Sequence, residues 1–144
     1  MKLWRISEFA DLTGEGGLHY AARWNEGGLA IVYCSDHPST SLLEILVHSD
    51  RDDLPPTYQL LEILVPDKLP ILQPEVPRDW LDQYSATQRR GTQFLLDLKH
   101  PIMRVPSVVM PQASNYLLNP NHPDAASIRI VETWRYPFDS RLLA

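Results

Sequence analysis

The chain has 144 residues, of which 44% are hydrophobic and 22% charged, and its formal net charge is −5. This composition is typical of one soluble globular domain that is long enough to bury its own core. The acidic balance argues against direct binding of duplex DNA, and the single cysteine, Cys34, excludes an internal disulfide and a multi-cysteine zinc site.

Residues 1–17 combine a short apolar start with the loop from Thr13 to Gly17, and they lack the apolar core of a secretion signal. Gly14-x-Gly16 lacks the third glycine and the preceding strand of a dinucleotide-binding fingerprint, so we do not assign it that function. No apolar run approaches the length of a membrane span. We therefore expect a cytoplasmic protein with no membrane partner.

A strand and a helix are predicted in the next part of the chain. Leu29–Tyr33 is apolar, rich in β-branched residues and follows a glycine pair, which predicts a strand leaving a turn. The segment Ser39–His48 predicts a short helix, with Ser39 or Ser41 as its N-cap.

Helical spacing gives the predicted helix two faces. One face is an apolar stripe that we expect to be buried, formed by Leu42, Leu43, Leu46 and Val47. The other face holds Ser41, Glu44, Ile45 and His48, so Glu44 and His48 are neighbours one turn apart. A carboxylate this close to a buried stripe is expected at the edge of the core, on the floor of a cleft.

The remaining chain predicts short strands and one further helix. Tyr58–Val65 predicts a strand, and the proline-rich segment Asp67–Asp79 predicts an ordered loop. Trp80–Lys99 has helical patterning that is interrupted near Ser85. Further short strands are expected at Met103–Met110, Asn115–Leu118 and Ser127–Thr133. Together these elements predict an α+β fold, which we expect to form a single domain over residues 1–144.

Three residues on different elements have the chemistry to bind and cleave a charged nucleotide. Arg23 offers a rigid fork of donors for a pyrophosphate, and Tyr33 offers a face on which a flat ring can stack. Glu44 can stabilise a developing positive charge. Taken singly, each has an ordinary structural interpretation: a surface arginine, a rim aromatic, and a carboxylate favoured by the helix dipole.

The order of several motifs resembles the RES-domain family, the toxin half of RES–Xre toxin–antitoxin pairs. The resemblance runs from about Leu18 to Arg141, and the family's arginine, glutamate and serine fall on Arg23, Glu44 and Ser107. The matching motifs are Arg23-Trp-Asn, Val32-Tyr-Cys-Ser, Glu44-x-x-x-His48, Val105-Pro-Ser107, Asn115-Tyr-Leu-Leu-Asn119-Pro120, His122-Pro123 and Phe138-Asp139-x-Arg141.

The resemblance implies a fold and an activity. The fold would be a curved, split mixed sheet resembling that of ADP-ribosyltransferases. The activity would be cleavage of the bond between nicotinamide and ribose in NAD+, which is the substrate rather than a cofactor. Water or phosphate would be the acceptor, giving a glycohydrolase or a phosphorylase. The alternatives are a toxin that transfers ADP-ribose to a protein, and a catalytically inactive module that only binds an antitoxin.

The resemblance also implies residue roles. Arg23 would bind the pyrophosphate or the adjacent ribose, Tyr33 the nicotinamide, and Ser107 the ribose or phosphate. Asn115 and His48 are further candidates for substrate binding, and His48 could also orient Glu44. No metal is expected, since a glutamate and a histidine without a third ligand do not make a site.

Other motif residues are assigned structural roles. Asn119 and His122 would bond to the backbone in turns, Cys34 would be a small buried side chain, and Asp139 and Arg141 would form a pair. The implied partner is an Xre-type helix-turn-helix antitoxin. It would bring any DNA contact, in a complex holding at least two copies of this chain.

Overall fold

A computed structural model describes residues 1–143, and these form an α+β domain around one mixed sheet, as predicted. The strand order is β4-β5-β6-β2-β1-β3-β7, and all neighbours are antiparallel except β4 and β5. The strands are β1 (Lys2–Ile6), β2 (Val32–Ser35), β3 (Thr57–Leu64), β4 (Ile71–Leu72), β5 (Ile102–Pro106), β6 (Ser114–Leu118) and β7 (Arg129–Pro137). The α-helices are α1 (Glu15–His19), α2 (Pro38–His48) and α3 (Tyr84–Asp97), and the short 3-10 helices are η1 (Arg51–Asp53), η2 (Trp80–Asp82), η3 (Ala125–Ser127) and η4 (Ser140–Leu143).

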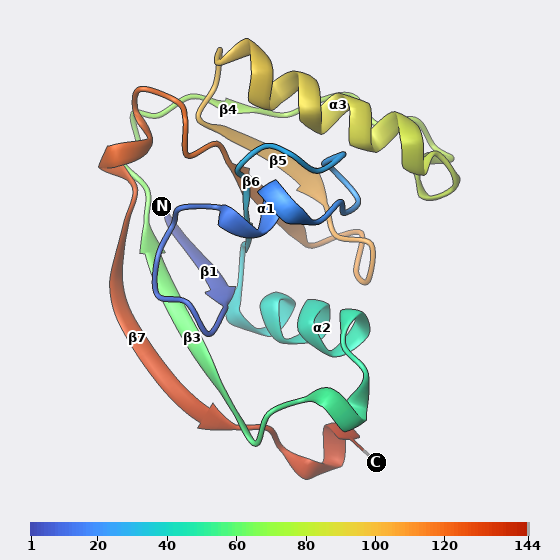
Figure 1. The fold of residues 1–144 in the computed structure, drawn as a ribbon, viewed down its shortest axis with the longest axis vertical. Helices are drawn as coiled ribbons and strands as arrows, with labels where there is room; N and C mark the ends of the chain where they lie inside the picture. Colours follow the sequence, from blue (N-terminus) through green and yellow to red (C-terminus); the bar gives the residue numbers. More distant parts are fainter. Residues whose placement is uncertain (144) are drawn as a thin grey trace.

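The sheet is nearly divided between β1 and β2. These two strands are paired only at Trp4 and Ser35, whereas β1 pairs with β3 along its whole length. Figure 1 shows the result: β1, β3 and β7 form one part, β4, β5 and β6 form the other beneath α3, and α2 lies in the opening between them. Ser41 of α2 donates to the Trp4 carbonyl oxygen at 3.1 Å, which fastens the helix beside the split. The predicted curved, split sheet is therefore present.

The sheet has an apolar core on each of its two faces. The first core includes Leu3, Val32, Ile63, Val65, Ile102 and Leu118. The second lies beneath α3 and includes Trp24, Trp80, Phe94, Leu95, Met103 and Leu117. Ile102 and Leu118 belong to the first core and their neighbours Met103 and Leu117 to the second, so the two cores lie on opposite faces of the sheet.

Gly91 sets how closely α3 approaches the segment that carries Arg23. A Cβ atom at Gly91 would lie 1.6 Å from the carbonyl oxygen of Trp24, far inside any allowed contact. Only glycine lets the backbone of α3 touch the chain at this point. The Arg23–Trp24 segment is therefore held directly against the helix.

The predicted helix Ser39–His48 is confirmed, but its N-cap prediction is wrong. Helix α2 begins at Pro38, and its N-cap is His37, whose Nδ1 accepts from the Ser39 backbone N–H at 3.1 Å. Proline suits the first helical position because its missing N–H would have no partner there. The Ser41 hydroxyl is used for the contact with β1 instead.

The prediction of a buried leucine stripe on this helix is also wrong. Leu43 and Val47 are 39% and 59% exposed, while Ser41 on the opposite face is 5% exposed. The helical period shows which residues share a face but not which face is covered. Here the polar face lies against the split in the sheet, where its groups find hydrogen-bond partners.

Several strand boundaries differ from the predictions. The strand predicted at Leu29–Tyr33 is β2, three residues later at its start, and β1 was not predicted as a strand. The proline-rich loop contains β4, which pairs with β5 in parallel. The predicted break in the helix at Trp80–Lys99 is real and separates η2 from α3. The strand expected to reach Met110 ends at Pro106.

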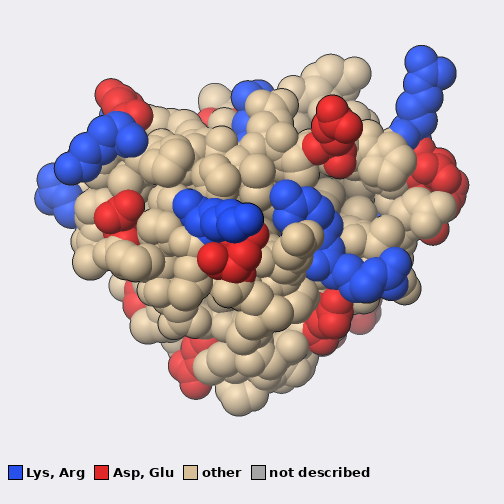
Figure 2. Space-filling view, turned by 90° about the horizontal axis from the view of Figure 1, so that it is seen from above, with Lys and Arg blue, Asp and Glu red and all other residues tan. Residues whose placement is uncertain are grey.

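The surface seen in Figure 2 carries lysine and arginine interspersed with aspartate and glutamate. Among residues 1–143, no helix has both the length and the apolar character needed to cross a bilayer.

Candidate functional site

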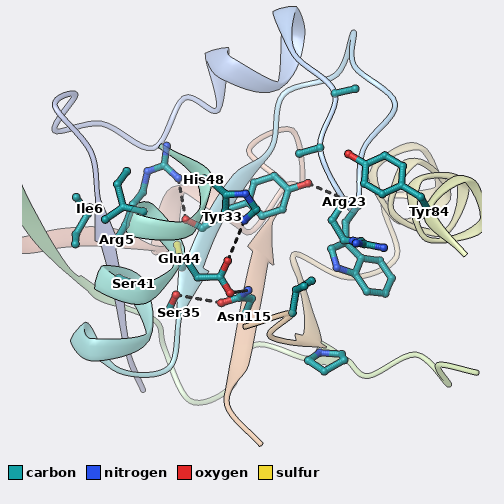
Figure 3. A pocket seen from close by; sticks show the side chains of 17 residues that line it. Arg5, Ile6, Arg23, Tyr33, Ser35, Ser41, Glu44, His48, Tyr84 and Asn115 are labelled. Carbon is teal, nitrogen blue, oxygen red and sulfur yellow. Dashed lines mark hydrogen bonds and ion pairs between the residues drawn. The ribbon is translucent and has the colours of Figure 1, made fainter. Parts of the chain in front are cut away.

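Glu44 lies on the inner face of α2 with both carboxylate oxygens bonded. Its Oε1 accepts from the Ser107 hydroxyl at 2.6 Å and from the Asn115 side-chain amide at 3.0 Å. Its Oε2 lies 3.2 Å from Nε2 of His48, one turn further along the helix. Figure 3 shows the carboxylate beside the Asn115 side chain. The side chain is 17% exposed, so a ligand can still reach it.

Ser107 is fully buried behind Glu44 and does not line the cavity. Its hydroxyl donates to Glu44 and accepts from the backbone N–H groups of Val109 and Met110, each at 3.2 Å. The family resemblance implied that Ser107 contacts ribose or phosphate. In this structure no part of Ser107 is exposed to the cavity. In this geometry Ser107 acts on the carboxylate rather than on a ligand.

Asn115 and His48 line the cavity and touch Glu44. Asn115 is held from behind, since its side-chain oxygen accepts from the Ser35 hydroxyl at 3.1 Å. This bond directs the amide nitrogen toward Glu44. His48 is 66% exposed at the cavity mouth, and its contact with Glu44 is the one that the spacing of the helix predicted.

Tyr33 is anchored through its hydroxyl group. The hydroxyl donates to the buried Asn25 side chain at 2.5 Å and accepts from the Trp24 backbone N–H at 3.2 Å. Burial raises the pKa of Tyr33 well above its usual value, so the phenol stays protonated. The backbone carbonyl of Tyr33 accepts from Arg5 at 2.8 Å. The ring therefore has a fixed plane that faces the cavity.

Arg23 lies on the other side of the cavity, near the start of α3 (Figure 3). Its guanidinium carbon is 4.7 Å from the centre of the Tyr84 ring and 5.7 Å from that of Trp80. One Nη donates to the Leu81 carbonyl oxygen at 3.0 Å. Since a guanidinium carries five N–H donors, this contact leaves donors for a ligand.

These side chains border a single cavity of about 470 Å³. Its lining includes five of the six predicted site residues: Arg23, Tyr33, Glu44, His48 and Asn115. Sequence reasoning missed Arg5 and Tyr84 in the lining and Asn25 behind Tyr33. Arg5 could have been found from the alternation of β1 had that strand been predicted. Nothing in the spacing of Tyr84 distinguishes it from an ordinary helix residue.

The residues assigned structural roles have them. Asn119 donates to the Leu95 carbonyl oxygen and accepts from the Asn121 N–H. His122 accepts from the Asp124 N–H, and Arg141 pairs with Asp139 at 2.7 Å. Cys34 is buried, which raises its pKa to about 12. Among the described residues, no group of three or more His, Cys, Asp or Glu side chains could hold a metal ion.

The chain folds as one α+β domain with a split mixed sheet, and the cavity that Glu44 lines lies beside the split. The model of the RES domain family matches residues 2–139, and the chain belongs to this family. It is 43% identical to a protein named Toxin Res from Pseudomonas putida, over 99% of each chain. It is 34% identical to a Prs ADP-ribosylating toxin from Sphingobium sp., covering 97% of this chain and 95% of the relative.

A solved structure shares the fold at low sequence identity. The crystal structure of the M. tuberculosis MbcT–MbcA toxin–antitoxin complex superimposes with a TM-score of 0.75 at 17% identity. The match covers 94% of this chain and 84% of that one. At this identity the likeness concerns the backbone arrangement.

Proposed function

We propose that this protein is the toxin of a toxin–antitoxin pair and that it cleaves the bond between nicotinamide and ribose in NAD+. The observation that carries the proposal is the Glu44 carboxylate. It is held by three side chains at the wall of a cavity that also presents an arginine and a fixed tyrosine ring. The name of one relative, Toxin Res, supports the role as a toxin, and that of another, Prs ADP-ribosylating toxin, supports an activity that uses NAD+.

A single carboxylate is enough for this reaction. An ordinary glycosidase needs a second, protonated carboxyl group because its alkoxide leaving group must gain a proton. Nicotinamide carries its positive charge in the substrate and departs as a neutral base. The positive charge that develops on the ribose is what an anion must stabilise. Glu44 meets that need without a partner acid.

Each lining residue has a proposed role in that step. Arg23 binds the pyrophosphate or the adjacent ribose through its free donors, and Tyr33 stacks against the nicotinamide ring. Glu44 stabilises the ribosyl cation. Ser107 and Asn115 both donate to Oε1, so they orient the carboxylate and direct Oε2 toward the cavity mouth. His48 lies beside Oε2, where it can orient that oxygen.

The acceptor decides between a glycohydrolase, a phosphorylase and a protein ADP-ribosyltransferase. Purified protein incubated with NAD+, with and without phosphate, would be analysed by mass spectrometry. We expect free ADP-ribose or its phosphate ester, together with nicotinamide. A protein that gains the mass of ADP-ribose would favour the transferase, for which the Sphingobium relative's name is the specific support. Folded protein that leaves NAD+ intact would support the inactive module instead.

We further propose that an Xre-type antitoxin binds over the cavity with its C-terminal segment and brings the DNA contact that a −5 chain is poorly suited to make. The simplest way to silence an arginine-lined cavity is to cover it. Deleting about a dozen C-terminal antitoxin residues should restore NAD+ loss in the complex. Full inhibition by a shortened antitoxin that still binds would exclude this mode. At least two copies of the chain are expected in the complex, which light scattering would measure.

A further inference from the structure

The start of α3 contacts both the backbone and the side chain of Arg23. The Thr87 hydroxyl donates to the Arg23 carbonyl oxygen at 2.7 Å and lies 2.9 Å from the Tyr84 carbonyl oxygen of its own helix. The Gln88 side-chain amide donates at 3.0 Å to the carbonyl oxygen of Ala22, the residue before Arg23. The first turns of α3 therefore hold the backbone from which the Arg23 side chain extends.

These backbone contacts lie outside the cavity and are sheltered from water. Thr87 is buried, Gln88 is partly buried, and neither side chain lines the cavity. A hydrogen bond is stronger in such surroundings than in water, so it fixes a backbone position more firmly. The base of the Arg23 side chain is therefore held in place before a ligand arrives.

Tyr84 contacts the charged end of Arg23. Its ring centre lies 4.7 Å from the guanidinium carbon, and Figure 3 shows the two side chains next to each other. Trp80, the second ring beside the guanidinium, is itself held by stacking on Trp24 with the ring centres 6.2 Å apart. A guanidinium is attracted to the face of an aromatic ring, and stacking leaves the N–H donors at its edge available to a ligand.

Tyr84 also lines the cavity, so contact with substrate and support of Arg23 are two distinct roles for it. The contacts of the helix favour support. Thr87, which bonds to the Arg23 backbone, comes three residues after Tyr84 on the same helix. The ring and the backbone of Arg23 are therefore held by one rigid element, and the guanidinium lies between that element and the cavity.

We propose that Tyr84 is a positioning residue that acts on the substrate through Arg23, while Thr87 and Gln88 hold the backbone of the same segment. The guanidinium then meets the ligand with its plane already set, so that binding does not have to order a long flexible side chain. This inference rests on the proposed function for the identity of the ligand. The alignment of Arg23 itself does not depend on that function.

The test is a double-mutant cycle measured by steady-state kinetics with NAD+. Tyr84→Leu should raise KM about fivefold, the size of one exposed cation–π contact, and leave kcat nearly unchanged. In an Arg23→Ala background the same substitution should change KM no further. Tyr84→Phe, which keeps the ring, should match the wild type. Leu96→Ala is the matched control, because Leu96 is exposed on the same helix but does not line the cavity.

The backbone contacts are tested in the same cycle. Thr87→Val loses the donor to the Arg23 carbonyl oxygen and should raise KM, but not in the Arg23→Ala background. Thr87→Ser keeps the hydroxyl and should restore the KM of the wild type. An equal rise in both backgrounds would show that Thr87 stabilises the fold in general and does not act through Arg23.

A rise in KM that persists when Tyr84→Leu is combined with Arg23→Ala would overturn the inference, since Tyr84 would then contact the substrate itself. An unchanged KM for Tyr84→Leu alone would overturn it as well. If the wild type leaves NAD+ intact, the proposed function fails by itself, and NMR of the ligand-free protein gives a separate answer. The Arg23 Nε–H signal should be displaced by the Tyr84 ring, moving in Tyr84→Leu but hardly in Tyr84→Phe. A signal that Tyr84→Leu leaves unchanged would refute the positioning role.

Discussion

The two walls of the cavity hold their functional groups by different means. On the α2 wall, the Glu44 carboxylate is bonded to Ser107, Asn115 and His48, and Ser107 is fully buried. On the α3 wall, the guanidinium of Arg23 rests on two aromatic rings and one backbone carbonyl group. The position of the Glu44 carboxylate is therefore fixed by directional hydrogen bonds. The position of the Arg23 guanidinium is set by stacking, which allows the group to slide along the rings. A group that must face one reacting atom needs the first arrangement, whereas one that binds a flexible phosphate tolerates the second.

The largest expected effect comes from removing the charge on the rigid wall. Glu44→Gln should lower kcat for NAD+ cleavage by about 10²- to 10³-fold, because the transition state loses its counter-charge. The glutamine oxygen can still accept from Ser107 and Asn115, so the fold should persist. In a bacterial host, the wild type should arrest growth and lower NAD+, and the variant should relieve both effects. Folded Glu44→Gln protein with near-normal turnover would remove Glu44 from its assigned role.

Loosening the same wall without touching its charge should give an intermediate effect. Ser107→Ala removes one donor to Glu44 and leaves the N–H groups of Val109 and Met110 without their acceptor. We expect a loss of ~1–3 kcal/mol in the free energy of unfolding and a clear fall in kcat with KM little changed. Ser35→Ala is the milder control, since it only frees Asn115. A rise in KM without a fall in kcat would instead indicate that Ser107 contacts substrate.

The stacked wall should respond through binding. Arg23→Lys keeps the charge but loses the planar fork and the stacking on Tyr84, so KM for NAD+ should rise roughly tenfold, corresponding to ~1.4 kcal/mol. Arg23→Ala should be worse, and lysine should not restore full activity. Steady-state kinetics would measure both. A fully active lysine variant would show that Arg23 acts as a point charge and that the stacking is incidental.

The smallest effect is expected from an exposed pair that combines an arginine and a carboxylate outside either wall. The hydrogen bonds from Arg141 hold the pKa of Asp139 below its usual value. The contribution of the Asp139–Arg141 pair to the stability of the fold is fully present above the pKa that Asp139 has in the unfolded chain. It is lost as the pH falls through the lower pKa of Asp139 in the folded protein. Arg141→Ala should return the pKa of Asp139 toward its ordinary value, as an NMR titration would show, with no change in NAD+ cleavage. Changed activity would mean that the C-terminal turn communicates with the cavity.

The sequence predicted the α2 wall better than the α3 wall. Helical spacing correctly made Glu44 and His48 neighbours, and the order of motifs brought Asn115 into the same site. The buried face of α2 was assigned wrongly, because periodicity does not reveal which face tertiary packing covers. Tyr84 was missed since its contact with Arg23 arises only when α3 packs back across a long separation in sequence.

Gly91 offers a way to weaken the α3 wall without changing any residue that lines the cavity. A methyl group added at Gly91 would collide with the Trp24 carbonyl group. It would therefore force α3 away from the segment that bears Arg23. The added methyl group changes no polar group and no charge. We expect Gly91→Ala to destabilise the protein, which thermal unfolding would measure. Such a substitution leaves the Glu44 carboxylate and its partners chemically unaltered.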